Sequence, residues 1–180
     1  MTIEDMIEKT IGHEGEYSNH PNDTGGETMW GITKRVARAN GYNGPMDALP
    51  RSEAVRIYRT EYAIKPGFAA IAAVSPAIGA ELFDTGVNMH PHHPSLWLQE
   101  CLNAFNNEGR HYADVVEDGN IGPRTVAALR AFLVRRPHDG EEVMVKALNC
   151  KQGARYLDLA RARQKNEAFV YGWMRNRVAL

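Results

Sequence analysis

Two carboxylates and a hydroxyl lie close together in the sequence near the start of the chain, at Glu14, Asp23 and Thr28. Glu14 directly follows a stretch with helical periodicity, and the C-terminal end of a helix carries partial negative charge that disfavours an ionised carboxylate. Partial burial would act in the same direction and raise the pKa of Glu14, as a general acid near neutral pH requires. With Asp23 and Thr28 able to orient a water, the set suits cleavage of a glycosidic bond.

A purely structural interpretation of these three residues also stands. Glu, Asp and Thr are common residue types, and a Glu that ends a surface helix explains Glu14 without any catalysis. An Asp that fixes an Asx turn explains Asp23 equally well. The spacing alone therefore leaves both interpretations open.

The elements that must position these side chains are mostly helical. Apolar residues at positions 3, 6, 7 and 11 predict a first helix over residues 3–12, with Thr2 and Asp5 as its capping box. Residues 18–31 are rich in Asn, Pro, Asp, Thr and Gly and predict turns or a short irregular hairpin. Further helices are predicted over 33–40, 50–62, 123–135, 141–164 and 167–178, and Pro76 and Pro94 take the first helical position of two more. The fold class expected is mainly α, with one small irregular β-hairpin near the N-terminus.

Length and charge limit the classes of function. A chain of 180 residues with 43% hydrophobic residues fits one domain, and a net charge of -1 gives no reason to expect nucleic acid as a partner. The charge is unevenly placed, because residues 130–180 hold 11 of the 21 Lys and Arg but 5 of the 22 Asp and Glu. A basic tail suggests a negatively charged partner, such as a cell-wall polymer or a lipid surface, and a solvated helix face explains it equally well.

The N-terminal residues and the cysteines bear on the compartment. The acidic start of the chain has neither the positive charge nor the apolar run of a signal peptide, and no stretch reaches the roughly 20 apolar residues of a membrane span. We therefore expect synthesis in the cytoplasm, where Cys101 and Cys150 stay reduced. Cys101 shares a helical stripe with apolar neighbours and is expected to be a buried small hydrophobic residue.

The N-terminal half resembles a known family. The run that carries the resemblance is Glu14-Gly15-x-Tyr17-x-Asn19-x-Pro21-x-Asp23-x-Gly25-Gly26-x-Thr28-x-x-Gly31-Ile32, followed by Ile57-Tyr58-Arg59, Tyr62 and the segment Leu82-Phe83-Asp84-Thr85-Gly86-Val87-Asn88-Met89. It is similar to the signature of glycoside hydrolase family 108, N-acetylmuramidases found as bacteriophage endolysins and bacterial cell-wall hydrolases. The second half looks like the predicted peptidoglycan-binding region that accompanies that family, through Asp118-Gly119-Asn120-Ile121-Gly122-Pro123-x-Thr125 and Phe169-x-x-Gly172-Trp173-x-x-Arg177. The expected division is a catalytic region over 1–94 and a peptidoglycan-binding helical region over 95–180, packed into one globule.

The resemblance implies a lysozyme-like α fold and a set of site residues. Glu14 would be the catalytic acid, with Asp23 and Thr28 positioning water or stabilising the positively charged sugar. Tyr17, Asn19, Trp30 and Asn88 would contact the glycan, although each also has an ordinary role in a core, a turn or a helix end. No metal or cofactor is expected. The substrate would be peptidoglycan, cut between N-acetylmuramic acid and N-acetylglucosamine.

The resemblance also implies a biological setting. The protein would act in phage-induced lysis, made as a monomer in the host cytoplasm and released to the wall through a separate pore, a holin. Its basic C-terminal helices, with Arg155, Arg161, Arg163 and Lys165, could contact the anionic outer-membrane surface.

Two other classes of function compete with this one. His13-Glu14 begins like a zinc-binding HExxH helix, but Tyr17 stands where the second His belongs, and the cluster His90, His92 and His93 is interrupted by prolines. A zinc-dependent amidase or peptidase is thus one alternative. The other is a non-catalytic cell-wall or membrane binding module that uses the basic tail alone. A calcium loop at Asp118 is disfavoured because the twelfth position is the apolar Leu129.

Overall fold

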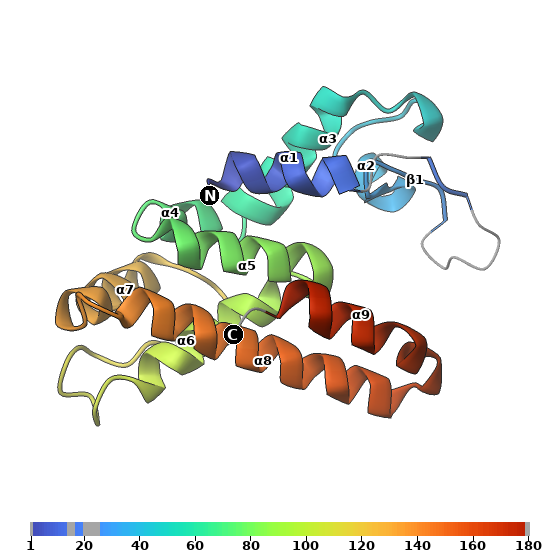
Figure 1. The fold of residues 1–180 in the computed structure, drawn as a ribbon. Coiled ribbons are helices and arrows are strands. Elements are labelled where there is room, and N and C mark those ends of the chain that lie inside the picture. Colours follow the sequence, from blue (N-terminus) through green and yellow to red (C-terminus); the bar gives the residue numbers. More distant parts are fainter. Residues whose placement is uncertain (1, 14–16, 20–25, 179–180) are drawn as a thin grey trace.

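The computed structural model describes residues 2–13, 17–19 and 26–178, apart from the side chain of His13. Helices dominate this part of the chain, as predicted, and a two-stranded sheet lies near the N-terminus (Figure 1). The helices are α1 (Ile3–His13), α2 (Lys34–Ala39), α3 (Arg51–Tyr58), α4 (Phe68–Ala72), α5 (Pro76–Met89), α6 (His92–Ala104), α7 (Pro123–Arg135), α8 (Gly140–Ala162) and α9 (Glu167–Arg177), with short helical segments η1 (Met46–Ala48), η2 (Arg59–Ile64) and η3 (Gln164–Asn166). The strands are β1 (Thr28–Met29) and β2 (Ile32–Thr33). None of the described helices is long and apolar enough to cross a membrane.

The first helix forms as the sequence predicts, with its end one residue later. The Thr2 N–H donates to Asp5 Oδ2 at 2.7 Å and the Asp5 N–H donates to Thr2 Oγ1 at 3.1 Å, which is the reciprocal pattern of a capping box. The apolar positions 3, 6, 7 and 11 are all buried. The helix is therefore fixed at both its start and its apolar face, and its C-terminal end is held in place.

The hairpin is short and sharply turned. β1 and β2 pair antiparallel, with Thr28 opposite Thr33 and Met29 opposite Ile32. The two turn residues, Trp30 and Gly31, both have positive φ, at 55° and 73°, as a two-residue turn of this kind requires. Trp30 is held in this conformation by Tyr58, whose hydroxyl donates to the Trp30 carbonyl at 3.1 Å.

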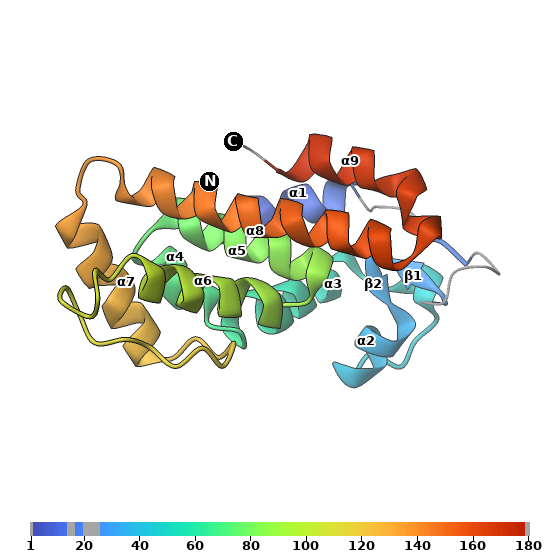
Figure 2. The same ribbon diagram turned by 90° about the horizontal axis from the view of Figure 1, so that it is seen from below.

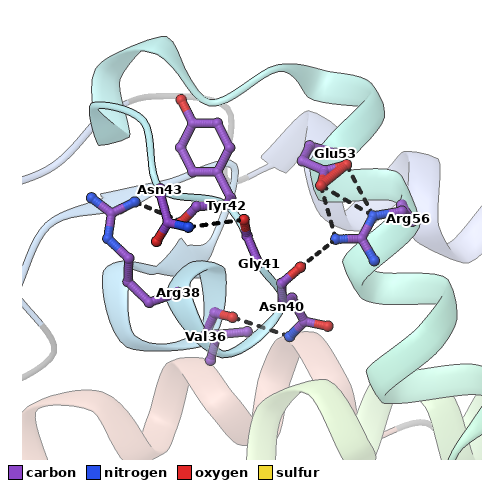
Figure 3. Close-up of polar contacts among 8 residues, drawn as sticks. All are labelled: Val36, Arg38, Asn40, Gly41, Tyr42, Asn43, Glu53 and Arg56. Carbon is purple, nitrogen blue, oxygen red and sulfur yellow. Dashed lines mark hydrogen bonds and ion pairs between the residues drawn. The ribbon is translucent and has the colours of Figure 1, made fainter.

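Two arginines fix the loop that follows α2 (Figure 3). Arg38 donates to the carbonyls of Tyr42 at 2.6 Å and Gly44 at 2.9 Å. Arg56, paired with Glu53 on α3, donates to the Asn40 carbonyl at 2.8 Å. Loop carbonyls that have no helical partner are satisfied in this way, and α2 is tied to α3.

Helix α5 runs through the centre of the molecule, with α1 on one side and α8 on the other (Figures 1 and 2). It begins as predicted, with Pro76 in its first position and the Ser75 hydroxyl accepting from the Ile78 N–H at 3.1 Å. The same hydroxyl donates to Glu141 on α8 at 2.6 Å. The prediction that Pro94 starts the next helix was wrong by two residues, because α6 begins at His92 and a first turn tolerates proline where no N–H is needed.

A polar seam joins α5 to α8 inside the molecule. The Gln152 amide donates to Thr85 Oγ1 at 3.0 Å, and the Thr85 hydroxyl donates to Glu81 Oε1 at 3.1 Å. Glu81 is also hydrogen-bonded by Asn149, which is fully buried. Burial raises the pKa of Glu81 above its usual value, and these hydrogen bonds oppose that effect only in part. The seam thus holds an acid that is more stable in its neutral form than it is in water.

The Glu81→Gln variant is expected to be more thermostable than the parent at pH 8. A pKa raised in the folded state contributes stability below the unfolded value, and that contribution is lost as pH rises through the folded value. A neutral amide avoids this loss, so we expect a gain in Tm of about 2–4 °C at pH 8, equivalent to about 1 kcal/mol, and no gain at pH 4. Thermal unfolding at both pH values measures this change in Tm. Glu142→Gln, at an exposed residue, is the control. A lower Tm at pH 8 would contradict the burial argument.

The prediction that Cys101 is a buried hydrophobic residue is confirmed. Cys101 is buried on α6 and burial raises the pKa of its thiol to about 11, so it remains a thiol. Cys150 is exposed, and both are free.

Candidate active site

A cleft of about 910 Å³ opens between the C-terminal half of α1, helix α5 and the last helix, α9. Met6, Lys9 and Thr10 face it from α1, Gly31 from the hairpin turn and Tyr58 from the end of α3. The remaining lining residues come from α5 and α9: Asp84, Val87, Asn88, Ala168, Phe169, Gly172, Trp173, Asn176 and Arg177. Amide, hydroxyl and aromatic groups face one space of the size that holds an organic ligand.

Two of the three predicted catalytic residues, Glu14 and Asp23, lie outside the described residues. The structure does describe the helix that precedes Glu14 in the sequence. This helix, α1, ends at His13, and the turn before its last residues lines the cleft. Thr28 lies in β1, where its hydroxyl is 3.4 Å from the Gly26 carbonyl. Its backbone pairs with Ser18 through two hydrogen bonds of 2.8 and 2.9 Å. The roles of all three residues remain predictions.

Tyr17 and Asn19 lie beside the hairpin. The Tyr17 side chain is 42% exposed, its hydroxyl donates to Glu27 at 3.3 Å, and its side chain is also hydrogen-bonded to Asn19. Burial and the Glu27 carboxylate raise the pKa of Tyr17, so the hydroxyl stays protonated. Both side chains are accessible next to the hairpin, and contact with the glycan remains a prediction.

Trp30 has a clear structural role. Its indole N–H donates to the Leu49 carbonyl at 2.8 Å and its ring packs against the hydrophobic core. The indole N–H is therefore already hydrogen-bonded, and the ring ties the hairpin to the segment before α3. A sugar contact for Trp30 stays a prediction that none of these contacts requires.

Asn88 lies in the cleft, at the level where α5, α8 and α9 meet. Its amide donates to the Tyr156 hydroxyl, and burial raises the pKa of Tyr156 to about 12. The Tyr156 ring lies 5.3 Å from the Trp173 ring, between centroids. A smaller depression of about 270 Å³ continues from this point and shares Asn88 and Trp173 with the cleft. The residue predicted from the second motif of the resemblance is thus part of the cleft.

Helix α9 supplies one wall of the cleft, which the sequence did not predict. Phe169, Gly172, Trp173 and Asn176 follow helical spacing and all face the cleft. No residue of α9, which the structure describes throughout, is fully buried, and Phe169 is 58% exposed. The Phe169 and Trp173 rings are stacked, with centroids 6.1 Å apart. The same spacing would also predict an apolar stripe that faces the core. Periodicity therefore identifies this face of α9 but does not show whether the face lines a cleft or packs in the core.

An ion pair joins the two halves of the chain across the cleft. Arg177 Nη1 lies 3.3 Å from Asp84 Oδ1, and both side chains are about one-third exposed. Asp84 and Arg177 belong to different motifs of the sequence, one in each half. Their contact fixes the end of α9 against α5.

The histidine cluster is divided between two places. His93 faces the small depression beside the cleft, where burial and Arg155 lower its pKa. His90 and His92 line a separate groove. No group of three metal-ligating side chains occurs among the described residues, so nothing there supports the zinc alternative.

Asp118 belongs to a turn. Its carboxylate accepts from the Asn120 N–H at 2.8 Å and from Gln99 at 2.9 Å, and these bonds lower its pKa. Leu129, at the position where a calcium loop has a glutamate, is fully buried in the core. The turn that feeds α7 is as predicted, and α7 begins at Pro123.

Two family models cover most of the chain. Residues 7–89 match Glycosyl hydrolase 108, and residues 93–178 match the model described as Predicted Peptidoglycan domain. The protein is therefore a peptidoglycan-hydrolysing glycoside hydrolase. Its N-terminal half belongs to the glycosyl hydrolase 108 family, with muramidase-type activity. The cleft lies where the two matched regions meet.

Comparison with solved structures supports the fold. The chain is similar to the structure of Brucella abortus SagA, at 20% identity and a TM-score of 0.59, over 98% of each chain. At that identity the likeness concerns the fold alone. No curated protein matches the sequence.

Proposed function

We propose that this enzyme cleaves the β-1,4 bond from N-acetylmuramic acid to N-acetylglucosamine in the cleft between α1 and α9, with Glu14 as general acid. The observation that carries the proposal is the position of α1, whose last turns face a cleft built from both matched regions. In the sequence, Glu14 directly follows His13, the last residue of α1.

The lining of the cleft supports a saccharide as the ligand. Sugars present apolar faces and many hydroxyls, which aromatic rings and amides complement. Phe169 and Trp173 provide the rings, and Asn88 and Asn176 provide amides on opposite walls. Asp23 and Thr28 would position the attacking water or stabilise positive charge on the sugar, and a Glu general acid with a second carboxylate is the usual pairing for this chemistry.

The class of bond cut tests this proposal against the amidase alternative. Digestion of purified peptidoglycan should create new reducing ends without new free amino groups, and a chelator should leave the rate unchanged. New amino groups that disappear with chelation would instead support a zinc amidase or peptidase.

Replacing Trp173 with Ala is expected to lower kcat/KM on peptidoglycan about three- to tenfold, mainly through a higher KM. The reason is loss of a ring face for the sugar, worth about 1 kcal/mol. The matched control is Tyr171→Ala, on the same helix but 76% exposed and outside the cleft lining, which should leave both constants unchanged. Equal losses in the two variants would contradict a role of this helix face in binding.

The setting in phage-induced lysis rests on the family resemblance. We propose synthesis as a monomer in the host cytoplasm and release to the wall through a separate pore. Exposed basic residues at the end of α8 and in η3, Arg161, Arg163 and Lys165, would contact the anionic outer-membrane surface. Expression in a bacterial host should cause lysis only when a pore-forming partner is present, and lysis without one would contradict this route.

A further inference from the structure

A second groove, of about 500 Å³, is lined in part by the α5–α6 turn and shares no lining residue with the cleft. Three elements form most of it: helix α2, the π-helical segment η2 and the turn that leads into α6. Its polar lining includes Arg35, Tyr62, Lys65, His90, His92 and Asn120, none of which lines the cleft. Tyr62 and Asn120 belong to the motifs of the resemblance, but the proposed mechanism does not use this groove.

The groove is lined by an exposed cation, Arg35, that has no counter-ion among the described residues. Glu61 is the one acidic side chain among its described lining residues, and Glu61 is paired with Lys65. Arg35 makes no hydrogen bond or ion pair with another described residue. A guanidinium has five N–H donors in a fixed plane, so an unpaired one in a groove is suited to a carboxylate.

Tyr62 adds a neutral donor beside Arg35. Burial raises the pKa of Tyr62, although the nearby Arg35 opposes this, so its hydroxyl remains protonated. Its ring packs against the Tyr58 ring, with centroids 5.5 Å apart, which fixes its position. The hydroxyl itself donates to no other described residue, and it is free for a ligand oxygen.

The histidine side of the groove is held in a fixed shape. His90 has a φ of 76°, unusual for a non-glycine residue, and its Nδ1 accepts from the His92 N–H at 3.3 Å. Gly119 packs directly on His92, since a Cβ there would lie 2.2 Å from His92 Nδ1. The buried Gln99 holds that loop, accepting from the N–H groups of Asp118 and Gly119 at 3.0 and 2.7 Å. Such pre-arranged geometry is typical of ligand sites.

The groove is close enough to the cleft to receive a branch of the same ligand. Asn88 lines the cleft and His90, two residues later, lines the groove, so their Cα atoms lie at most about 7 Å apart. Peptidoglycan has such branches, because its muramic acid residues carry short peptides that end in carboxylates. A glycan strand in the cleft would bring these stems to the α5–α6 turn.

We infer that the Arg35 groove binds a carboxylate of the peptide stem and so makes the enzyme prefer peptide-bearing peptidoglycan. This inference rests on the proposed cleavage of the glycan in the cleft. Arg35 and the Tyr62 hydroxyl would donate to the carboxylate, while the His90–His92 turn forms the opposite wall.

The test compares peptide-bearing peptidoglycan with the same glycan stripped of its stems by an amidase. Arg35→Gln is expected to lower kcat/KM about tenfold on the first substrate, through KM, and to leave the second within twofold, as loss of a charge-assisted hydrogen bond predicts. Arg59→Gln makes the same charge change on η2, at a residue that does not line the groove, and should alter kcat/KM on neither substrate. Arg35→Lys should recover part of the loss. Equal loss on both substrates, or no loss on either, would overturn the inference.

A binding measurement separates this inference from the proposed function. Free stem tetrapeptide is titrated calorimetrically into the full-length protein, and binding should be present in the parent and lost in Arg35→Gln. Peptide binding without any glycan cleavage by the parent would refute the proposed function but support peptide binding in the Arg35 groove. Cleavage without peptide binding would refute peptide binding in the Arg35 groove and leave the proposed function standing. Arg35-dependent binding to anionic vesicles in place of peptide binding would have the same meaning.

Discussion

Replacing Glu14 with Gln is expected to lower kcat on peptidoglycan about 10³-fold. General acid catalysis contributes factors of about 10² to 10⁴, and an amide of the same shape cannot protonate the leaving oxygen. The change in KM should be small, because a Gln still fits the same space. Turnover of soluble glycan fragments measures the effect.

The control for this variant is Glu8→Gln on the same helix. Glu8 is exposed and paired with Arg51, away from the cleft lining, so its replacement should leave kcat unchanged. The Glu14→Gln protein should still bind insoluble peptidoglycan as the parent does. A Glu14→Gln enzyme with more than a tenth of the parent kcat would show that another group supplies the proton.

Replacing Gly79 with Ala is expected to destabilise the fold by about 3 kcal/mol. Helices α4 and α5 approach so closely here that a Cβ at Gly79 would lie 2.5 Å from Ala72 Cβ and 2.6 Å from Ala72 Cα. The obstacle is backbone and cannot move aside as a flexible side chain can, so the two helices must separate. For a chain of this size the expected fall in Tm is about 6–12 °C.

A second glycine provides the matched control for this close approach. Gly12 lies on α1, where a Cβ would have no atom of the described residues within 4 Å, and Gly12→Ala should leave the Tm unchanged or raise it. Since α5 carries Asp84 and Asn88, activity of the Gly79→Ala variant should fall together with its stability. A normal Tm for Gly79→Ala would mean that α4 adjusts without cost.

The helices with strong local signals could be predicted from the sequence. The Thr2 and Asp5 box, the Ser75 cap and Pro123 each use local hydrogen bonds or a fixed φ, and each marks the predicted boundary. Helix α4 was missed, because its five residues follow a glycine with φ of 84° and have no side-chain cap. The continuation of α3 as a π-helix was also missed, since no local sequence signal separates it from an α-helix.

The site could be predicted only in part. Asn88 was predicted from its motif and lies in the cleft, whereas Trp30 is mainly occupied by its bond to the Leu49 carbonyl. Phe169 and Trp173 were predicted as part of the peptidoglycan-binding region, and nothing in the sequence indicated that they face the same cleft as α1. Such a meeting of distant segments depends on tertiary packing, which helical periodicity does not contain.

The most direct test of the central claim is mass spectrometry of peptidoglycan fragments after digestion and borohydride reduction. The parent protein should release fragments whose reduced ends are muramic acid, and the Glu14→Gln variant should release almost none. Reduced glucosamine ends, or cuts confined to peptide and amide bonds, would contradict a muramidase that uses Glu14 in the cleft between α1 and α9.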